Sequence, residues 1–131
     1  CLGMQILFTV GHEHGITEGL NLISGEVQRL EPINDQKIPH VGWNSIEISN
    51  VDDESFINLN GIHQYFVHSY ALKFTDENAP YSLFTSNFEE YKFISMLRKL
   101  NTIGIQFHPE RSGRDGIQLL RNTINNLLLS K

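Results

Sequence analysis

The sequence has little that would tie the protein to a membrane, to a nucleic acid or to an oxidising compartment. Its 131 residues include one cysteine, which leaves no partner for an internal disulfide. The longest apolar runs, such as 6–8 and 127–129, are far shorter than the roughly 20 residues of a membrane-spanning helix. Lysine and arginine total 10 against 15 acidic residues, so the net charge is -5 and no basic stripe is available to grip phosphates. These scarcities predict a soluble, cytoplasmic protein that binds neither nucleic acid nor membrane.

The composition that remains is that of one globular domain. Hydrophobic residues make up 40% of the chain and charged residues 19%, which is typical neither of disordered proteins nor of coiled coils. The length corresponds to a single domain, and the chain contains no repeat or low-complexity tract. We therefore expect one hydrophobic core.

The hydrophobic pattern changes between strand and helix signals along the chain. Helices are predicted at 2–8 and 113–131, a loop or short helix at 50–60, and strands at 26–30, 37–48, 64–74, 81–85 and 102–107. In the last helix, apolar residues recur at helical spacing, namely Ile117, Leu120, Ile124, Leu127 and Leu128. No element or function is assigned to 88–100. The pattern indicates an α/β fold in which helices cover a mixed sheet.

The only cysteine stands at the first position, directly before a predicted helix, in Cys1-Leu2-Gly3-Met4-Gln5. Unpaired N–H groups at a helix start stabilise a thiolate, and Gly3 lets another group approach the backbone closely. A buried, inert cysteine fits the position equally well. Three readings of an initial cysteine compete: a lipoprotein, which lacks its usual polar tether here, an N-terminal nucleophile hydrolase, and a fragment whose upstream part is missing.

Two further clusters could carry chemistry. In 106–110, Gln-Phe-His-Pro-Glu, an extended backbone would place His108 and Glu110 on the same side. A carboxylate that accepts from one imidazole nitrogen fixes the tautomer and leaves the other nitrogen free to take a proton from a thiol. A lone histidine is more often structural, so the tripeptide is weak by itself. The run 65–70, Tyr-Phe-Val-His-Ser-Tyr, reads as a strand end with three polar side chains, and a solvated strand end explains it as well.

Taken together and in this order, the clusters resemble the class I glutamine amidotransferases. The segment 39–44, Pro-His-Val-Gly-Trp-Asn, is similar to the glutaminase subunit of imidazole glycerol phosphate synthase, the HisH family. The 65–70 run and Ser112-Gly113 strengthen that resemblance, which extends from Cys1 to the final helix. It implies an α/β, flavodoxin-like amidotransferase domain with a mixed sheet.

The resemblance also implies roles for individual residues. Cys1 would attack the side-chain amide of glutamine, His108 would act as the base, and Glu110 would orient His108, with no cofactor. The backbone N–H of Leu2 would donate to the oxyanion. The substrate L-glutamine would be held by Gln5, Glu13, His68, Ser69 and Tyr70. The surroundings of Glu13 are unusual for the family, because His12 and His14 flank it, but these histidines have no third ligand nearby and no metal is expected.

A partner is implied by the same resemblance. The glutaminase would form a heterodimer with a synthase (cyclase) subunit, a (β/α)₈ barrel that receives ammonia and forms imidazole glycerol phosphate in histidine biosynthesis. The expected interface residues are Pro39, Trp43, Asn44 and Arg111, although core packing is an alternative for Trp43. Arg111 stands where the family usually has lysine. A paralogous subunit that amidates surface-polysaccharide sugars, or a non-catalytic binding fragment, is the alternative function.

The resemblance favours the fragment reading of the first residue. Family members place strands ahead of the nucleophile. If the missing segment consists of two and a half βαβ units, it has roughly 75 residues. Residues 1–131 are therefore expected to be the C-terminal part of a single domain whose upstream strands, with a Gly-rich oxyanion loop, are missing.

Overall fold

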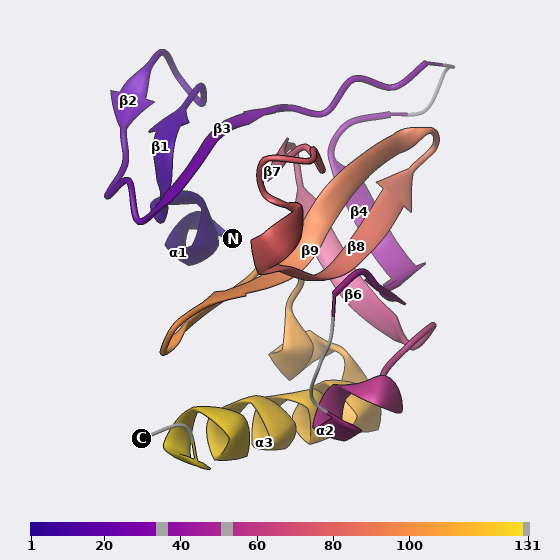
Figure 1. Ribbon diagram of the computed structural model, residues 1–131. Coiled ribbons are helices and arrows are strands. Elements are labelled where there is room, and N and C mark those ends of the chain that lie inside the picture. The colour runs from indigo at the N-terminus through magenta and orange to yellow at the C-terminus, as the bar shows by residue number, and fades with distance from the viewer. Residues whose placement is uncertain (34–36, 51–53, 130–131) are drawn as a thin grey trace.

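The computed structural model describes residues 1–33, 37–50 and 54–129, and its strands are distributed over three sheets (Figure 1). The first sheet has the order β2-β1-β3-β7 and contains β1 (Phe8–Gly11), β2 (Thr17–Glu18), β3 (Ile23–Arg29) and β7 (Tyr70–Leu72). The second has the order β10-β9-β8-β5 and contains β5 (Glu47–Ile48), β8 (Ser82–Phe88), β9 (Tyr91–Lys99) and β10 (Thr102–Ile105). The third is the pair of β4 (His40–Ser45) and β6 (His63–His68).

The helices of the described residues are mostly short. They are α1 (Leu2–Gln5), α2 (Glu54–Ile57), α3 (Gly113–Leu129) and the 3-10 turns η1 (Ala79–Tyr81) and η2 (Pro109–Arg111). Helix α3 lies along one side of the molecule, next to α2 and below the β8–β9 hairpin in Figure 1. None of these helices is long and apolar enough to cross a membrane.

Two apolar clusters hold the sheets together because most of the strands bury one or both of their faces. Aromatic residues dominate the larger cluster, where α3 and η2 meet the second and third sheets; it includes Phe66, Phe84, Phe93, Phe107 and Leu119. The smaller cluster joins α1 to the first sheet and to β9; it includes Met4, Phe8, Ile23, Leu72 and Ile94. Strand β9 contributes to both clusters and is the longest strand, with nine residues.

The chain passes from one sheet to another at Ser69. Strand β6 ends at His68, where it pairs with β4, and β7 begins at Tyr70, where it pairs with β3. The Leu30 N–H donates to the Ser69 carbonyl at 2.9 Å, which ties this crossing to the end of β3. The crossing therefore brings the 65–70 segment next to the N-terminal sheet and α1.

The α/β class is confirmed, and most predicted elements are present. The strand predicted at 37–48 is split into β4 and β5, and the strand predicted at 64–74 into β6 and β7. The helix predicted over 2–8 ends at Gln5, because the chain turns there and Phe8 starts β1. Part of 50–60 lies outside the described residues, and the remainder holds α2. Strands β1, β2 and β9 were not predicted.

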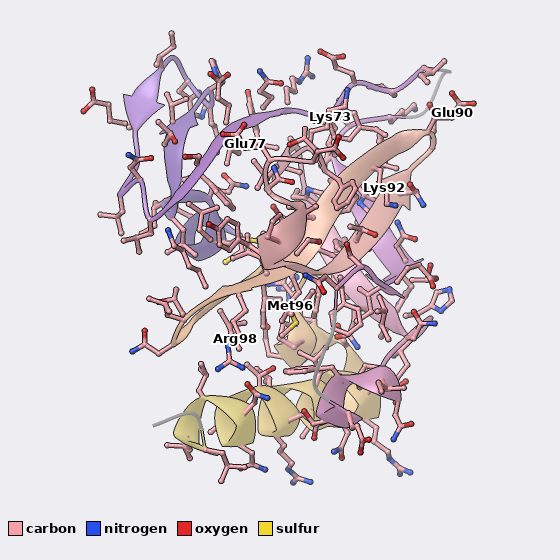
Figure 2. All side chains as sticks on the ribbon, in the orientation of Figure 1. Lys73, Glu77, Glu90, Lys92, Met96 and Arg98 are labelled. Carbon is pink, nitrogen blue, oxygen red and sulfur yellow. The ribbon has the colours of Figure 1, made fainter. Side chains whose placement is uncertain are left out.

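The final helix is confirmed, but it does not bury its apolar stripe. Leu119, Thr123 and Asn126 are buried, whereas Ile117 and Ile124 are exposed. Figure 2 shows Met96 and Arg98 of β9 directed toward α3, and Arg98 donates a hydrogen bond to Asn126. The buried face of α3 thus packs through Leu119, which belongs to the larger apolar cluster, and the Arg98–Asn126 hydrogen bond adds a polar contact with β9.

Candidate active site

Cys1 lies at the start of α1 and its side chain is exposed. Its carbonyl accepts the first intrahelical hydrogen bond, from the Gln5 N–H at 3.2 Å. The N–H of Leu2 belongs to the first turn, where N–H groups have no intrahelical acceptor. A methyl group at Gly3 would lie 3.7 Å from the Cys1 sulfur, so glycine keeps the space beside the thiol open. The start of α1 therefore places the Cys1 thiol next to a backbone N–H that has no acceptor within the helix.

His108 and Glu110 are in direct contact, with 2.7 Å between Nδ1 and Oε1. Partial burial raises the pKa of the Glu110 carboxyl, but the hydrogen bond from His108 and the charges of His108 and Arg111 outweigh it, so the pKa lies below its ordinary value. A carboxylate can only accept, so Nδ1 carries the proton and Nε2 is the basic nitrogen. The expected contact is confirmed, but the backbone is the 3-10 turn η2 and not an extended segment.

A serine that the sequence did not single out for this role fixes the turn that carries the pair. The Ser112 hydroxyl donates to the His108 carbonyl at 2.7 Å and accepts from the Tyr65 N–H at 2.8 Å. The His108 N–H in turn donates to the Tyr65 carbonyl at 2.9 Å. Three hydrogen bonds therefore hold His108 against β6. Sequence pattern offers no signal for this role, because it depends on the distance between η2 and β6.

Cys1 and His108 line one pocket of about 250 Å³, together with all five residues expected to hold glutamine. Its lining is Cys1, Leu2, Gln5, Glu13, Val67, His68, Ser69, Tyr70 and His108. Glu110 does not line it and reaches it through His108. Val67 was not predicted, although it lies inside the 65–70 run. The pocket thus joins α1, the loop after β1, the β6–β7 crossing and the residue before η2.

The whole of this arrangement falls within a known family. The model of the family "Glutamine amidotransferase class-I" matches residues 1–127. The chain belongs to the class I glutamine amidotransferases. Among its relatives, the imidazole glycerol phosphate synthase subunit HisH of Carboxydothermus hydrogenoformans is 44% identical over 122 residues, which are 93% of this chain and 58% of that protein.

Two further relatives have similar names. HisH 1 of Campylobacter jejuni (strain 81-176) is 42% identical over 93% of this chain and 59% of that protein. The chloroplastic imidazole glycerol phosphate synthase hisHF of Arabidopsis thaliana is 39% identical over 95% of this chain and 21% of that protein. The amidotransferase chain described here thus spans less than two thirds of the length of each of these relatives.

Polar contacts inside the amidotransferase pocket connect its walls. The Gln5 side-chain amide donates to the Tyr70 carbonyl at 3.3 Å, which ties α1 to the start of β7. Glu13 is exposed at the pocket edge. The neighbouring His12 contacts Glu26 at 3.2 Å, and no three potential metal ligands are grouped among the described residues.

Strands β4 and β6 of the amidotransferase present an apolar outer face. Val41 pairs with Val67, and Trp43 pairs with Tyr65, so the four side chains share one side of the two-stranded ladder. The Trp43 and Tyr65 rings are 6.0 Å apart in an edge-on arrangement. Trp43 is 56% exposed, so its core-packing alternative is wrong. Because Val67 also lines the pocket, this outer face reaches the pocket rim.

The other residues expected at an interface lie around this face. Pro39 precedes β4 and is exposed, and Arg111 is exposed at the end of η2, next to Glu110. Asn44 differs from them because its side chain is on the inner side of β4, where its amide donates to the Asn87 carbonyl at 2.8 Å. Asn44 therefore holds β4 on β8.

Proposed function

We propose that this chain carries the glutaminase site of a glutamine amidotransferase, with Cys1, His108 and Glu110 as the catalytic triad. The observation that carries the proposal is the pocket in which a thiol at a helix start faces the same space as an imidazole oriented by a carboxylate. A thiol, a base and a group that orients the base are the parts of nucleophilic acyl transfer.

The reaction uses each of these groups. His108 Nε2 takes the thiol proton, and the Cys1 thiolate attacks the amide carbon of glutamine, while the Leu2 N–H donates to the developing oxyanion. The C–N bond then breaks and ammonia leaves with the proton from His108. Water hydrolyses the γ-glutamyl thioester, which releases glutamate and restores the thiol. Glutamine would be held by Gln5, Glu13 and the backbone and side chains of 68–70.

The names of the relatives favour histidine biosynthesis over the surface-polysaccharide alternative. Each of the relatives described above is named as imidazole glycerol phosphate synthase or its HisH subunit. The ammonia released here would then pass to a synthase subunit, a (β/α)₈ barrel, as a heterodimer in the cytoplasm. Ammonia protonates in bulk water and ceases to be a nucleophile, so its transfer requires a closely docked partner.

The apolar outer face of β4 and β6 is the docking site that we propose for the synthase. An exposed tryptophan among valines and a tyrosine is typical of the centre of a protein interface. This face reaches the rim of the pocket through Val67, and Arg111 adds a charge beside Glu110. A partner bound there would lie close to the point at which ammonia is released.

Replacing the thiol tests the proposed reaction. In the complete gene product, Cys1→Ala should remove glutamate release from glutamine, because no nucleophile remains, while synthase activity with added ammonium is retained. The control is the wild-type protein in the same two assays. Glutaminase turnover in Cys1→Ala would refute Cys1 as the nucleophile, and loss of the ammonium-dependent activity would show that the substitution damages the fold or the complex.

A further inference from the structure

His40 and His68 form a buried pair directly behind the glutamine pocket. They face each other across the β4–β6 ladder, and His40 Nδ1 lies 2.9 Å from His68 Nε2. Both side chains are almost fully buried, at 7% and 6% exposure. His68 lines the pocket and His40 does not. Neither the catalytic triad nor the partner face makes use of His40.

The contacts of the pair select one tautomer for each ring. His68 Nδ1 is 3.0 Å from the Tyr70 carbonyl, which can only accept, so this nitrogen carries the proton. Neutral His68 therefore accepts at Nε2, and the donor is His40 Nδ1–H. Burial lowers the pKa of His40 to about 4 and that of His68 to about 3, which keeps both rings neutral. His40 Nε2 is then an acceptor for the Asn44 amide, at 3.4 Å.

The relay ends at the backbone that forms the pocket wall. The Tyr70 carbonyl accepts from His68 on one side and from the Gln5 amide on the other, so one oxygen joins α1 to the β6–β7 crossing. Ser69 lies between His68 and Tyr70, and its carbonyl is held by the Leu30 N–H. The orientation of this short segment therefore depends on the proton on His68 Nδ1.

We propose that His40 is a positioning residue for glutamine binding, which acts by holding His68 in the tautomer that fixes the Tyr70 carbonyl. The proposal rests on the glutaminase function proposed above. Without the His40 donor, His68 either keeps an unpaired buried nitrogen or moves its proton to Nε2 and releases Tyr70. Each outcome loosens the wall against which glutamine would bind.

Packing alone is the competing role for His40. Its ring is stacked on Phe66, with centroids 5.1 Å apart and planes at 21°, and it also contacts Phe88. A phenylalanine in its place preserves a ring for these contacts and removes the donor. An asparagine is smaller but keeps an N–H group close to the position of Nδ1. The two variants therefore separate the donor from the packing.

The kinetic test uses the complete gene product with its synthase partner. His40→Phe should raise KM for glutamine about tenfold, because the pocket wall loosens. The change in kcat should be less than about threefold, because the triad stays in place. His40→Asn should restore KM to within about threefold of wild type, by the same reasoning. The control is Asn125→Phe, which introduces the same ring at an exposed residue of α3, away from β4 and β6. Wild-type KM in His40→Phe, or equal defects in both His40 variants, would overturn the proposal.

A spectroscopic measurement decides the tautomers without kinetics. Nitrogen chemical shifts of the imidazole rings should show His40 and His68 both neutral with the proton on Nδ1 in the wild-type protein, and His68 altered in His40→Phe. A wild-type His68 protonated on Nε2 would refute the relay even if His40→Phe does not fold. If the wild-type protein releases no glutamate, the proposed function fails. Unaltered His68 shifts in His40→Phe would instead overturn the positioning role alone.

Discussion

Gly116 of α3 packs directly on the carbonyl of Pro109 in η2. A methyl group built on Gly116 would lie 1.9 Å from that oxygen and 2.7 Å from the Ser112 side chain. The helix and the turn that carries Glu110 therefore approach as closely as only glycine permits. Because the obstacle is backbone, no side-chain rotation relieves it.

Gly116→Ala should consequently displace η2 and destabilise the protein. Overpacking of this kind costs about 1–3 kcal/mol, and the displaced turn should also reduce the rate of glutamate release. Urea denaturation and a glutaminase assay measure the two effects. The matched control is Gly11→Ala, whose added methyl would meet no atom of the described residues within 4 Å. An unchanged urea midpoint in Gly116→Ala would show that the contact is not tight in solution.

Ser112→Ala tests the anchor of His108. The substitution leaves the Tyr65 N–H without its acceptor and removes the donor to the His108 carbonyl. We therefore expect the free energy of unfolding to decrease by about 1–3 kcal/mol. The rate constant kcat should fall more than KM rises, because His108 acts in the reaction step. Ser49→Ala, at an exposed serine, is the control. Equal kcat values in wild type and Ser112→Ala would contradict the anchoring role.

Trp43→Ala tests the proposed docking face. Removal of an aromatic anchor at the centre of an interface commonly costs about 2 kcal/mol or more, so Kd for the synthase subunit should rise at least about thirtyfold. Titration calorimetry or sedimentation measures it. Ile57→Ala, at an exposed apolar residue of α2, should leave Kd unchanged. Unchanged affinity in Trp43→Ala would place the interface on another surface.

The buried histidine pair predicts a loss of stability in mild acid. The pKa values of His40 and His68, about 4 and about 3, lie below the ordinary value of 6.5, so the unfolded state binds more protons between pH 6.5 and 4. The contribution of the neutral pair to the free energy of unfolding is therefore fully present above pH 6.5. It decreases as the pH falls, by up to about 1.4 kcal/mol per pH unit for each ring. Urea midpoints at pH 7 and pH 5 measure it. His40→Phe should show a smaller decrease, and equal midpoints at both pH values in wild type would refute the prediction.

The sequence predicted the α/β class and most of the elements, but it did not predict strand β9. The candidates for the triad and for glutamine binding came from the resemblance carried by three short clusters in a fixed order, because each cluster alone also fitted a structural role. Strand β9 had no recognisable pattern. Its central run, Phe93–Leu97, is buried on both faces, so it lacks the alternation by which a strand is recognised.

What the sequence by itself determined is therefore local: the helix after Cys1, the contact of His108 with Glu110, and most of the strands. Only the tertiary structure decided that Cys1 and His108, separated by more than a hundred positions, open into the same pocket. It alone turned Trp43 outward and His40 inward on one strand and placed His40 opposite His68. The physical reason is that register and packing between strands depend on contacts between distant segments, which no local pattern of residues encodes.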